Sequence, residues 1–88
     1  MVERSVQVKN AHGIHARPAA EIVKVAARFA SSITIVRDDL EVNGKSIMGV
    51  MMLAAECGAT IIIRAVGDDA EAACDALVAL VNTKFGET

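Results

Sequence analysis

The stretch Gly13-Ile14-His15-Ala16-Arg17-Pro18-Ala19-Ala20 marks the point where the chain changes from strand-like to helix-like periodicity. Before it, residues 2–9 alternate apolar and polar side chains, which predicts a half-buried strand. After it, apolar residues recur at helical spacing over residues 16–30. Pro18 fits only the first turn of that helix, where its missing N–H costs nothing. The stretch therefore predicts a strand, a loop and a helix that starts at His15.

The rest of the chain adds three strands and two helices. The expected elements are a hairpin of strands at 33–35 and 40–42 turned by Asp38-Asp39, a short helix from Ile47 to about Leu53 capped by Ser46, a strand at 60–66, and a third helix opened at 67–69. Asp68 and Glu71 have the spacing of a capping box for the third helix, whose apolar stripe runs from Ala70 to Phe85. The order β-α-β-β-α-β-α predicts an α+β fold: a two-layer open-faced sandwich, with a four-stranded antiparallel sheet and three helices on one face.

Composition narrows the function. The chain has 88 residues, so we expect a single domain over 1–88. It lacks Trp and Tyr, which disfavours an aromatic-lined pocket for an organic substrate, and its net charge of -2 argues against nucleic-acid binding. The longest apolar run, 47–55, is far short of the ~20 residues of a membrane span. We expect a soluble, cytoplasmic protein that does not insert into membranes, with Cys57 and Cys74 as buried free thiols.

The residues around His15 are suited to binding an anion. The first N–H groups of a helix have no partner inside the helix and lie at the positive end of its dipole. The N–H groups of Ala16 and Arg17 are therefore candidate donors, and the Arg17 guanidinium can bind phosphoryl oxygens in a bidentate manner. Imidazole adds a nucleophile that is neutral at cytoplasmic pH. Taken alone, these residues fit an ordinary surface or helix-capping histidine equally well.

Two motifs resemble those of the HPr family, the histidine-containing phosphocarriers of the phosphoenolpyruvate:sugar phosphotransferase system. The first is the stretch 13–20 quoted above. The second is Gly44-Lys45-Ser46-Ile47-Met48-Gly49-Val50-Met51. The similarity extends over the whole chain, since length, element order and the separation of the motifs all agree.

This resemblance implies a covalent role for His15. In the family, the matching histidine accepts a phosphoryl group on Nδ1 from Enzyme I, which phosphoenolpyruvate has phosphorylated, and passes it to IIA domains of sugar permeases. The position of Arg17 matches the arginine that stabilises the phosphoryl group. The family member is a carrier with no turnover of its own, and no cofactor is expected. An alternative is the nitrogen-related branch, in which a similar phosphocarrier regulates metabolism without transporting sugar.

Ser46 has two interpretations. Its position before a short helix predicts an N-cap. The resemblance adds a regulatory role, because in many family members a bifunctional HPr kinase/phosphorylase modifies the serine at this position. A phosphate there would place roughly two negative charges beside the partner surface, which would disfavour docking of an acidic Enzyme I.

The short helix after Ser46 is crowded with apolar side chains. One interpretation packs Val50, Leu53 and Ala54 inward and lets the methionines fill gaps in the core. The other is an exposed, adaptable patch that docks several partners. We expect the second, with these members around His15: apolar Ile47, Met48 and Met51, and a basic rim of Lys24, Lys45 and Arg17.

His12 and His15 form a His-x-x-His pair. No cysteine or carboxylate lies nearby in sequence to complete a ligand set, so we expect no metal site. His12 either forms a hydrogen bond near the phosphoryl group or is merely exposed. We expect a monomer, since a carrier must present one site to several partners in turn.

Overall fold

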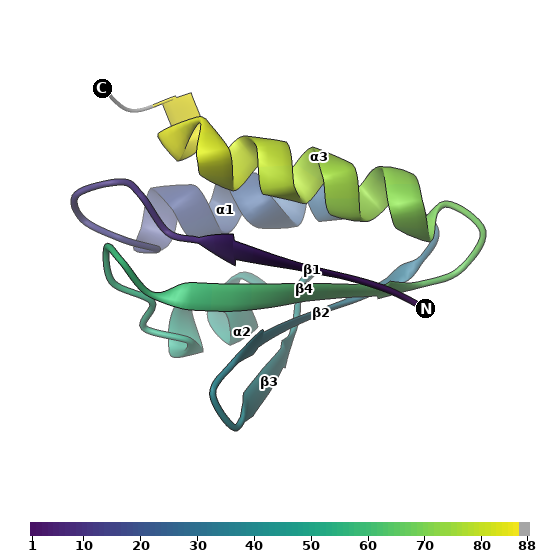
Figure 1. Ribbon diagram of the computed structural model, residues 1–88, viewed down its shortest axis with the longest axis horizontal. Helices are drawn as coiled ribbons and strands as arrows, with labels where there is room; N and C mark the ends of the chain where they lie inside the picture. Colours follow the sequence, from purple (N-terminus) through teal and green to yellow (C-terminus); the bar gives the residue numbers. More distant parts are fainter. Residues whose placement is uncertain (87–88) are drawn as a thin grey trace.

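The computed structural model describes residues 1–86, so the last two residues of the expected domain, 87–88, lie outside the described part. Strands and helices follow the predicted order (Figure 1). The elements are β1 (Val2–Gln7), α1 (Ala16–Ala26), β2 (Ser32–Arg37), β3 (Leu40–Asn43), α2 (Ile47–Met52), β4 (Thr60–Val66), α3 (Ala70–Asn82) and a 3-10 turn η1 (Lys84–Gly86).

The four strands form one antiparallel sheet in the order β1-β4-β2-β3. Val6 pairs with Ile61, and Ile35 pairs with Ile63 on the other side of β4. These side chains share the buried face of the sheet, because successive residues of a strand point to opposite faces. The three helices cover this face, which confirms the predicted two-layer sandwich (Figure 1).

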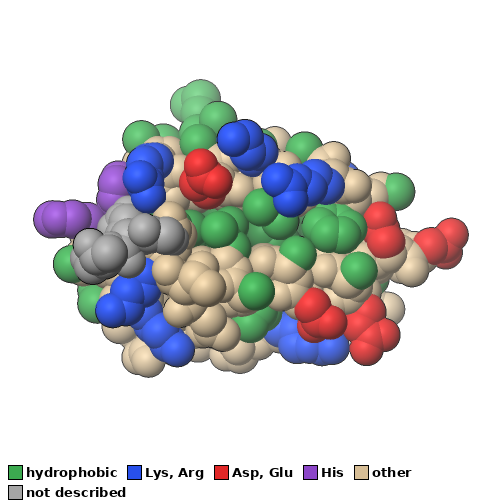
Figure 2. Space-filling model, turned by 90° about the horizontal axis from the view of Figure 1, so that it is seen from above, with side chains coloured by type: hydrophobic (Ala, Val, Ile, Leu, Met, Phe, Trp, Pro, Cys, Tyr) green, Lys and Arg blue, Asp and Glu red, His purple; other side chains and the backbone are tan. Residues whose placement is uncertain are grey.

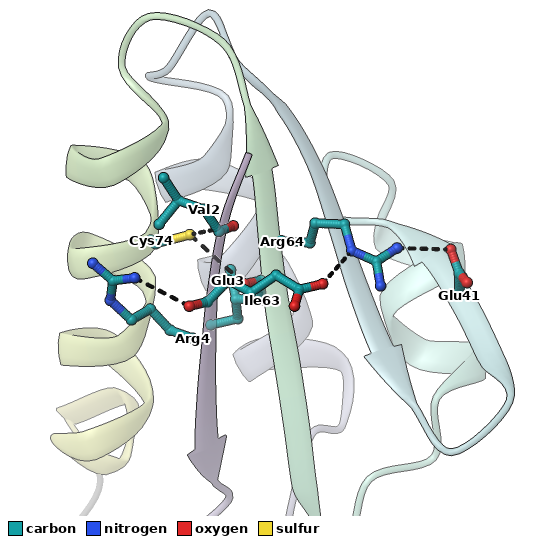
Figure 3. Close-up of polar contacts among 7 residues, drawn as sticks. All are labelled: Val2, Glu3, Arg4, Glu41, Ile63, Arg64 and Cys74. Atoms are coloured by element: carbon teal, nitrogen blue, oxygen red, sulfur yellow. Dashed lines mark hydrogen bonds and ion pairs between the residues drawn. The ribbon is translucent and has the colours of Figure 1, made fainter.

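The other face of the sheet carries a cluster of charged side chains (Figure 3). Arg64 of β4 lies between two carboxylates, at 2.7 Å from Glu3 Oε2 and 3.2 Å from Glu41 Oε1. On the helix side, the buried Cys74 thiol donates to the carbonyl oxygens of Val2 and Ile63, each at 3.6 Å. Burial raises the pKa of Cys74, so this thiol is held in its neutral form. The Arg64 cluster thus places its charges on the open face, while the thiol packed against the sheet stays uncharged.

Helix α1 ends at Ala26, earlier than the predicted end near residue 30. The chain tightens there into i→i−3 bonds, since Arg28 N donates to Val25 O and Phe29 N to Ala26 O. The Asp69 carboxylate accepts from the N–H groups of Ala30 and Ser31 and from the Ser31 hydroxyl. These backbone donors are therefore satisfied by a distant loop and not by a further helical turn.

The capping box that was predicted for α3 is wrong, because the Asp69 carboxylate is engaged elsewhere. The N-cap is Asp69 and not Asp68, and its side chain makes no capping hydrogen bond because it bonds to Ser31. Those hydrogen bonds, that of the Ser31 side chain foremost, lower the pKa of Asp69. The predicted apolar stripe is confirmed as buried, although Phe85 belongs to η1. The expectation for Cys57 is wrong, because it lies exposed in a turn outside any helix.

Candidate functional site

His15 lies exposed at the start of α1, as predicted. Its backbone is extended (φ −96°, ψ −163°), and its carbonyl accepts the first intrahelical bond from Ala19 N at 2.9 Å. The side chain makes no capping hydrogen bond to the helix. The imidazole therefore stands at the positive end of the helix dipole without neutralising the first N–H groups.

The loop before His15 is fixed from inside by Asn10, whose side chain is only 1% exposed. Asn10 Nδ2 donates to the carbonyl of Gly13 at 2.6 Å, and Gly13 N donates back to Asn10 O at 3.0 Å. The same Gly13 carbonyl also accepts from His15 N at 3.2 Å. Asn10 thus sets the position of the peptide group to which the backbone of His15 is bonded.

The segment after α2 fixes the loop from the other side. Ile14 N donates to the carbonyl of Ala55 at 2.8 Å, directly before His15. Gly13 has φ +66°, and a side-chain carbon there would collide with the Ala55 carbonyl and with Cα of Glu56. Only glycine fits both this conformation and this close approach of two backbones.

Arg17 lies in the first turn of α1, but its guanidinium is bonded elsewhere. Nη2 donates to the carbonyl of Phe85 at 3.0 Å, which joins the start of α1 to η1. This bond uses one donor of a group that has five. The structure therefore places Arg17 beside His15 in the fold and shows its guanidinium bonded to the backbone of η1.

The two histidines lie together at one end of the molecule, while several acidic side chains gather toward the opposite end of the face in view (Figure 2). The rings of His12 and His15 meet edge to face, with centroids 6.1 Å apart and an interplanar angle of 82°. Across residues 1–86, no group of three His, Cys, Asp or Glu side chains is placed to hold a metal ion. The end that bears the histidines thus combines two adjacent imidazoles with a helix start.

Ser46 is the N-cap of α2, as predicted. Its Oγ accepts from Gly49 N at 3.1 Å, and its carbonyl accepts from Val50 N at 3.0 Å. The side chain is half-buried. This hydroxyl has a structural role whether or not it is ever modified.

The short helix α2 presents an exposed apolar surface, which we call the α2 patch. Its members are Ile47, Met48, Met51 and Met52, which are 44%, 77%, 43% and 65% exposed. Val50 and Leu53 face the core, which agrees with that part of the core-filling interpretation, while the expected exposure of the patch is also found. Met52 also belongs to the patch, although it was not among the expected members. Ala54, which the core-filling interpretation packed inward, is exposed and has φ +48°.

The lysines do not form a rim around His15. Lys45 Nζ donates to the carbonyl of Phe29 at 2.8 Å, beyond the end of α1 that lies farthest from His15. An 11-residue helix is ~16 Å long, so Lys45 is distant from the imidazole. Lys24 is exposed in the last turn of α1. The predicted placement of Lys45 is therefore wrong, because its ammonium group binds the Phe29 carbonyl in the turn that follows α1.

Sequence reasoning missed three residues that shape the α2 patch, the His15 loop and the segment between them. Met52 enlarges the α2 patch, and Asn10 holds the His15 loop. Arg37, at the end of β2, donates to the carbonyls that follow α2. Met52 was visible as a fourth large apolar side chain on a two-turn helix, but the contacts of Asn10 and Arg37 arise only from tertiary folding.

Fold and site together define a class: small open-faced α+β domains that present one histidine at a helix start. The family model described as "PTS HPr component phosphorylation site" matches residues 2–83. The chain is 51% identical over 87 residues to the phosphocarrier protein HPr of Treponema pallidum, covering 99% of each chain. It superposes on a crystal structure of HPr from Thermoanaerobacter tengcongensis with a TM-score of 0.96 and 46% identity, covering 100% of this chain and 99% of that one. The chain belongs to the HPr family of phosphotransferase-system phosphocarriers.

Relatives of another name are similar too. The phosphocarrier protein NPr of Shewanella violacea is 41% identical over 86 residues, covering 98% of this chain and 94% of that one. The family is thus one of phosphoryl carriers rather than of enzymes that turn over a substrate, and it includes more than one kind of carrier. The resemblance stated from the two sequence motifs is confirmed.

Proposed function

We propose that His15 is the phosphoryl acceptor, taking the group from Enzyme I and passing it to IIA domains for sugar uptake. One observation carries this: an exposed imidazole stands at the start of α1 and leaves the helix uncapped. The lone pair of Nδ1 attacks phosphorus, a P–N bond forms, and the bond from phosphorus to the donor breaks. The charge on the phosphoryl oxygens then lies at the positive end of α1, near the N–H groups of Ala16 and Arg17.

Arg17 completes the site in this proposal. Its guanidinium exchanges the carbonyl of Phe85 for phosphoryl oxygens, because a charge-assisted bond to an anion is stronger than a bond to a neutral carbonyl. His12, whose ring centroid lies 6.1 Å from that of His15, is close enough to form a hydrogen bond near the phosphoryl group. No cofactor takes part in this transfer.

Partners dock on the α2 patch and its surroundings in this proposal. Exposed methionines adapt to several different surfaces, which suits a carrier that meets Enzyme I and IIA domains in turn. Lys24, in the last turn of α1, and Lys45, which bonds to Phe29 beyond that turn, supply positive charge at the end of α1 that lies away from His15. We propose that the protein works as a single 1–88 domain, as a cytoplasmic monomer, without nucleic acid. Among residues 1–86, no helix is long and apolar enough to cross a bilayer.

We further propose that an HPr kinase/phosphorylase modifies Ser46. Its hydroxyl lies at the start of α2, directly beside Ile47 and Met48, so a phosphate would put its charge next to the docking surface. Incubation with ATP and such a kinase should give an acid-stable label that Ser46→Ala lacks. Equal labelling of the variant would exclude Ser46 as the modified residue.

The central experiment combines the protein with Enzyme I and labelled phosphoenolpyruvate. We expect an acid-labile label on the wild type and none on His15→Ala, with Ser46→Ala as a folded control that still accepts label. Equal labelling of His15→Ala would disprove the proposal, and so would failure of the wild type with an Enzyme I of proven activity.

A second candidate is the nitrogen-related branch, which the similarity to NPr supports. The labelled protein should then transfer its phosphoryl group to a nitrogen-type IIA protein faster than to sugar-type IIA domains. Offering both acceptors in one reaction decides between the two branches.

A further inference from the structure

Arg37 binds three groups of the segment that follows α2. Its Nη1 donates to the carbonyls of Leu53 and Ala54, at 3.1 and 2.7 Å. Its Nη2 lies 2.6 Å from Oε1 of Glu56. The Arg37 side chain is 23% exposed, so these bonds are partly shielded from water. One side chain at the end of β2 thus holds both ends of the segment 53–56.

This segment needs support. The last carbonyls of a helix have no partner inside the helix, and Leu53 is the C-cap of α2. Ala54 has φ +48°, a conformation that side chains with a Cβ avoid. Arg37 satisfies the orphan carbonyls and places positive charge at the negative end of the helix dipole. It therefore stabilises a turn that the local sequence does not favour.

The held segment is also one wall of the His15 loop. Ala55, between the two ends that Arg37 binds, accepts from Ile14 N at 2.8 Å. The backbone of Gly13 is packed so closely against Ala55 and Glu56 that no Cβ fits there. A displacement of 53–56 is therefore passed directly to the peptide that precedes His15.

We propose that Arg37 is a positioning residue for His15. It sets the place of segment 53–56, which sets the place of the Gly13–Ile14 backbone and so the direction of the imidazole. The proposal rests on the function proposed for His15, because it concerns the rate at which that residue accepts a phosphoryl group. Small misplacements of a reacting group cost up to about a hundredfold in rate, so a remote clamp has a measurable effect.

The test replaces Arg37 by Met, which keeps much of the apolar stem and removes every donor. The matched control is Arg64→Met on the open face of the sheet, where Arg64 likewise binds several groups, here the carboxylates of Glu3 and Glu41, and is 30% exposed. With Enzyme I and phosphoenolpyruvate, we expect Arg37→Met to lower the maximal rate of acceptance about tenfold with KM within about twofold. Arg64→Met should change neither quantity by more than about twofold.

Amide hydrogen exchange gives a second measurement that needs no partner. The Ile14 N–H should exchange faster in Arg37→Met than expected from the change in global stability, and at the expected rate in Arg64→Met. Arg37→Lys, which retains the charge but not the forked donors, should fall between wild type and Arg37→Met, and it serves as the test if Arg37→Met does not fold.

Each outcome separates the two proposals. A rise in KM with an unchanged maximal rate would make Arg37 a partner contact and overturn its positioning role. Unchanged acceptance with unchanged exchange of Ile14 would overturn it as well. If the wild type accepts no phosphoryl group, the function proposed for His15 fails, while the exchange of Ile14 still shows whether Arg37 positions its loop.

Discussion

The two helix starts of this molecule solve the same problem in opposite ways. At α2, Ser46 turns its hydroxyl onto the helix and accepts from Gly49 N. At α1, His15 occupies the same N-cap position with the same extended backbone, yet its side chain makes no capping bond. The Ser46 side chain thus satisfies an N–H group of its own helix, whereas the His15 side chain satisfies none of the first N–H groups of α1.

The surroundings explain why the uncapped start persists. The His15 loop is held by the buried Asn10 side chain and by the carbonyl of Ala55, both of which act on residues before the helix. The Ser46 turn relies on shorter-range bonds, such as that from Lys45 N to Asn43 Oδ1. The α1 start thus takes its order from the tertiary structure, so its position does not depend on a capping bond from the His15 side chain.

The largest expected contrast lies between the two glycines of these regions. Gly13→Ala should destabilise the fold by about 3 kcal/mol, because its φ of +66° and the nearby Ala55 carbonyl both exclude a methyl group. Gly49→Ala should change stability by no more than about 0.5 kcal/mol, since the gain in helix propensity offsets tight contacts at 3.3 to 3.4 Å. Urea unfolding measures both. If the two variants were equally stable, the His15 loop would not be rigidly packed.

An intermediate effect on stability is expected from removing the N-cap of α2 and from adding one to α1. Ser46→Ala should cost about 1 kcal/mol, or roughly 4–8 °C in Tm, through loss of the bond to Gly49. His15→Ser should instead stabilise the protein by about 0.5 kcal/mol by supplying the missing cap, while losing the acid-labile label. Thermal unfolding compares the two directly. A loss of stability in His15→Ser would mean that the imidazole itself supports the helix.

The smallest expected effect is a change around His15 as Glu56 is protonated at low pH. A backbone hydrogen bond, followed by the bond from Arg37, lowers the pKa of Glu56. A lowered folded-state pKa contributes stability that is present above about pH 4.3, the ordinary value for glutamate, and is lost as pH falls through the lowered value. We expect the amide shift of Ile14 to move in that acidic window, while that of Gly49, bonded to a hydroxyl, stays nearly constant.

Glu56→Gln is the control for this titration, because an amide does not ionise in the same range. The Ile14 shift should then lose the acidic step that the wild type shows. A step of equal size in the variant would assign it to another carboxylate, with Asp69 as the first choice because its pKa is also lowered.

The features that could be predicted from the sequence are those set by local periodicity and local turn chemistry. The strand at 60–66, the N-cap at Ser46 and the helix start at His15 all match the structure. Prediction failed where a side chain bonds across the fold. Asp69 bonds to Ser31 and not to its own helix, and Lys45 bonds to Phe29 and not near His15. No spacing rule reveals such pairs, since their members come together only when the layers pack.

For the candidate site the division is similar. The histidine and its helix dipole follow from the stretch 13–20 alone. Its supports come from elsewhere in the fold: the buried Asn10 bonds to the loop itself, and Arg37 of β2 bonds to the segment 53–56 that packs against the loop. Sequence therefore identified the group proposed to react, and structure identified what holds it still.

The strand order β1-β4-β2-β3 has a consequence for folding during synthesis on the ribosome. β4 is the neighbour of both β1 and β2, yet it is made last of the four. A ribosome adds about 5–20 residues per second, so β1 waits several seconds for its partner. During that time only the β2–β3 hairpin can pair. The edges of β1 stay unpaired, so the nascent chain must avoid pairing β1 with other chains.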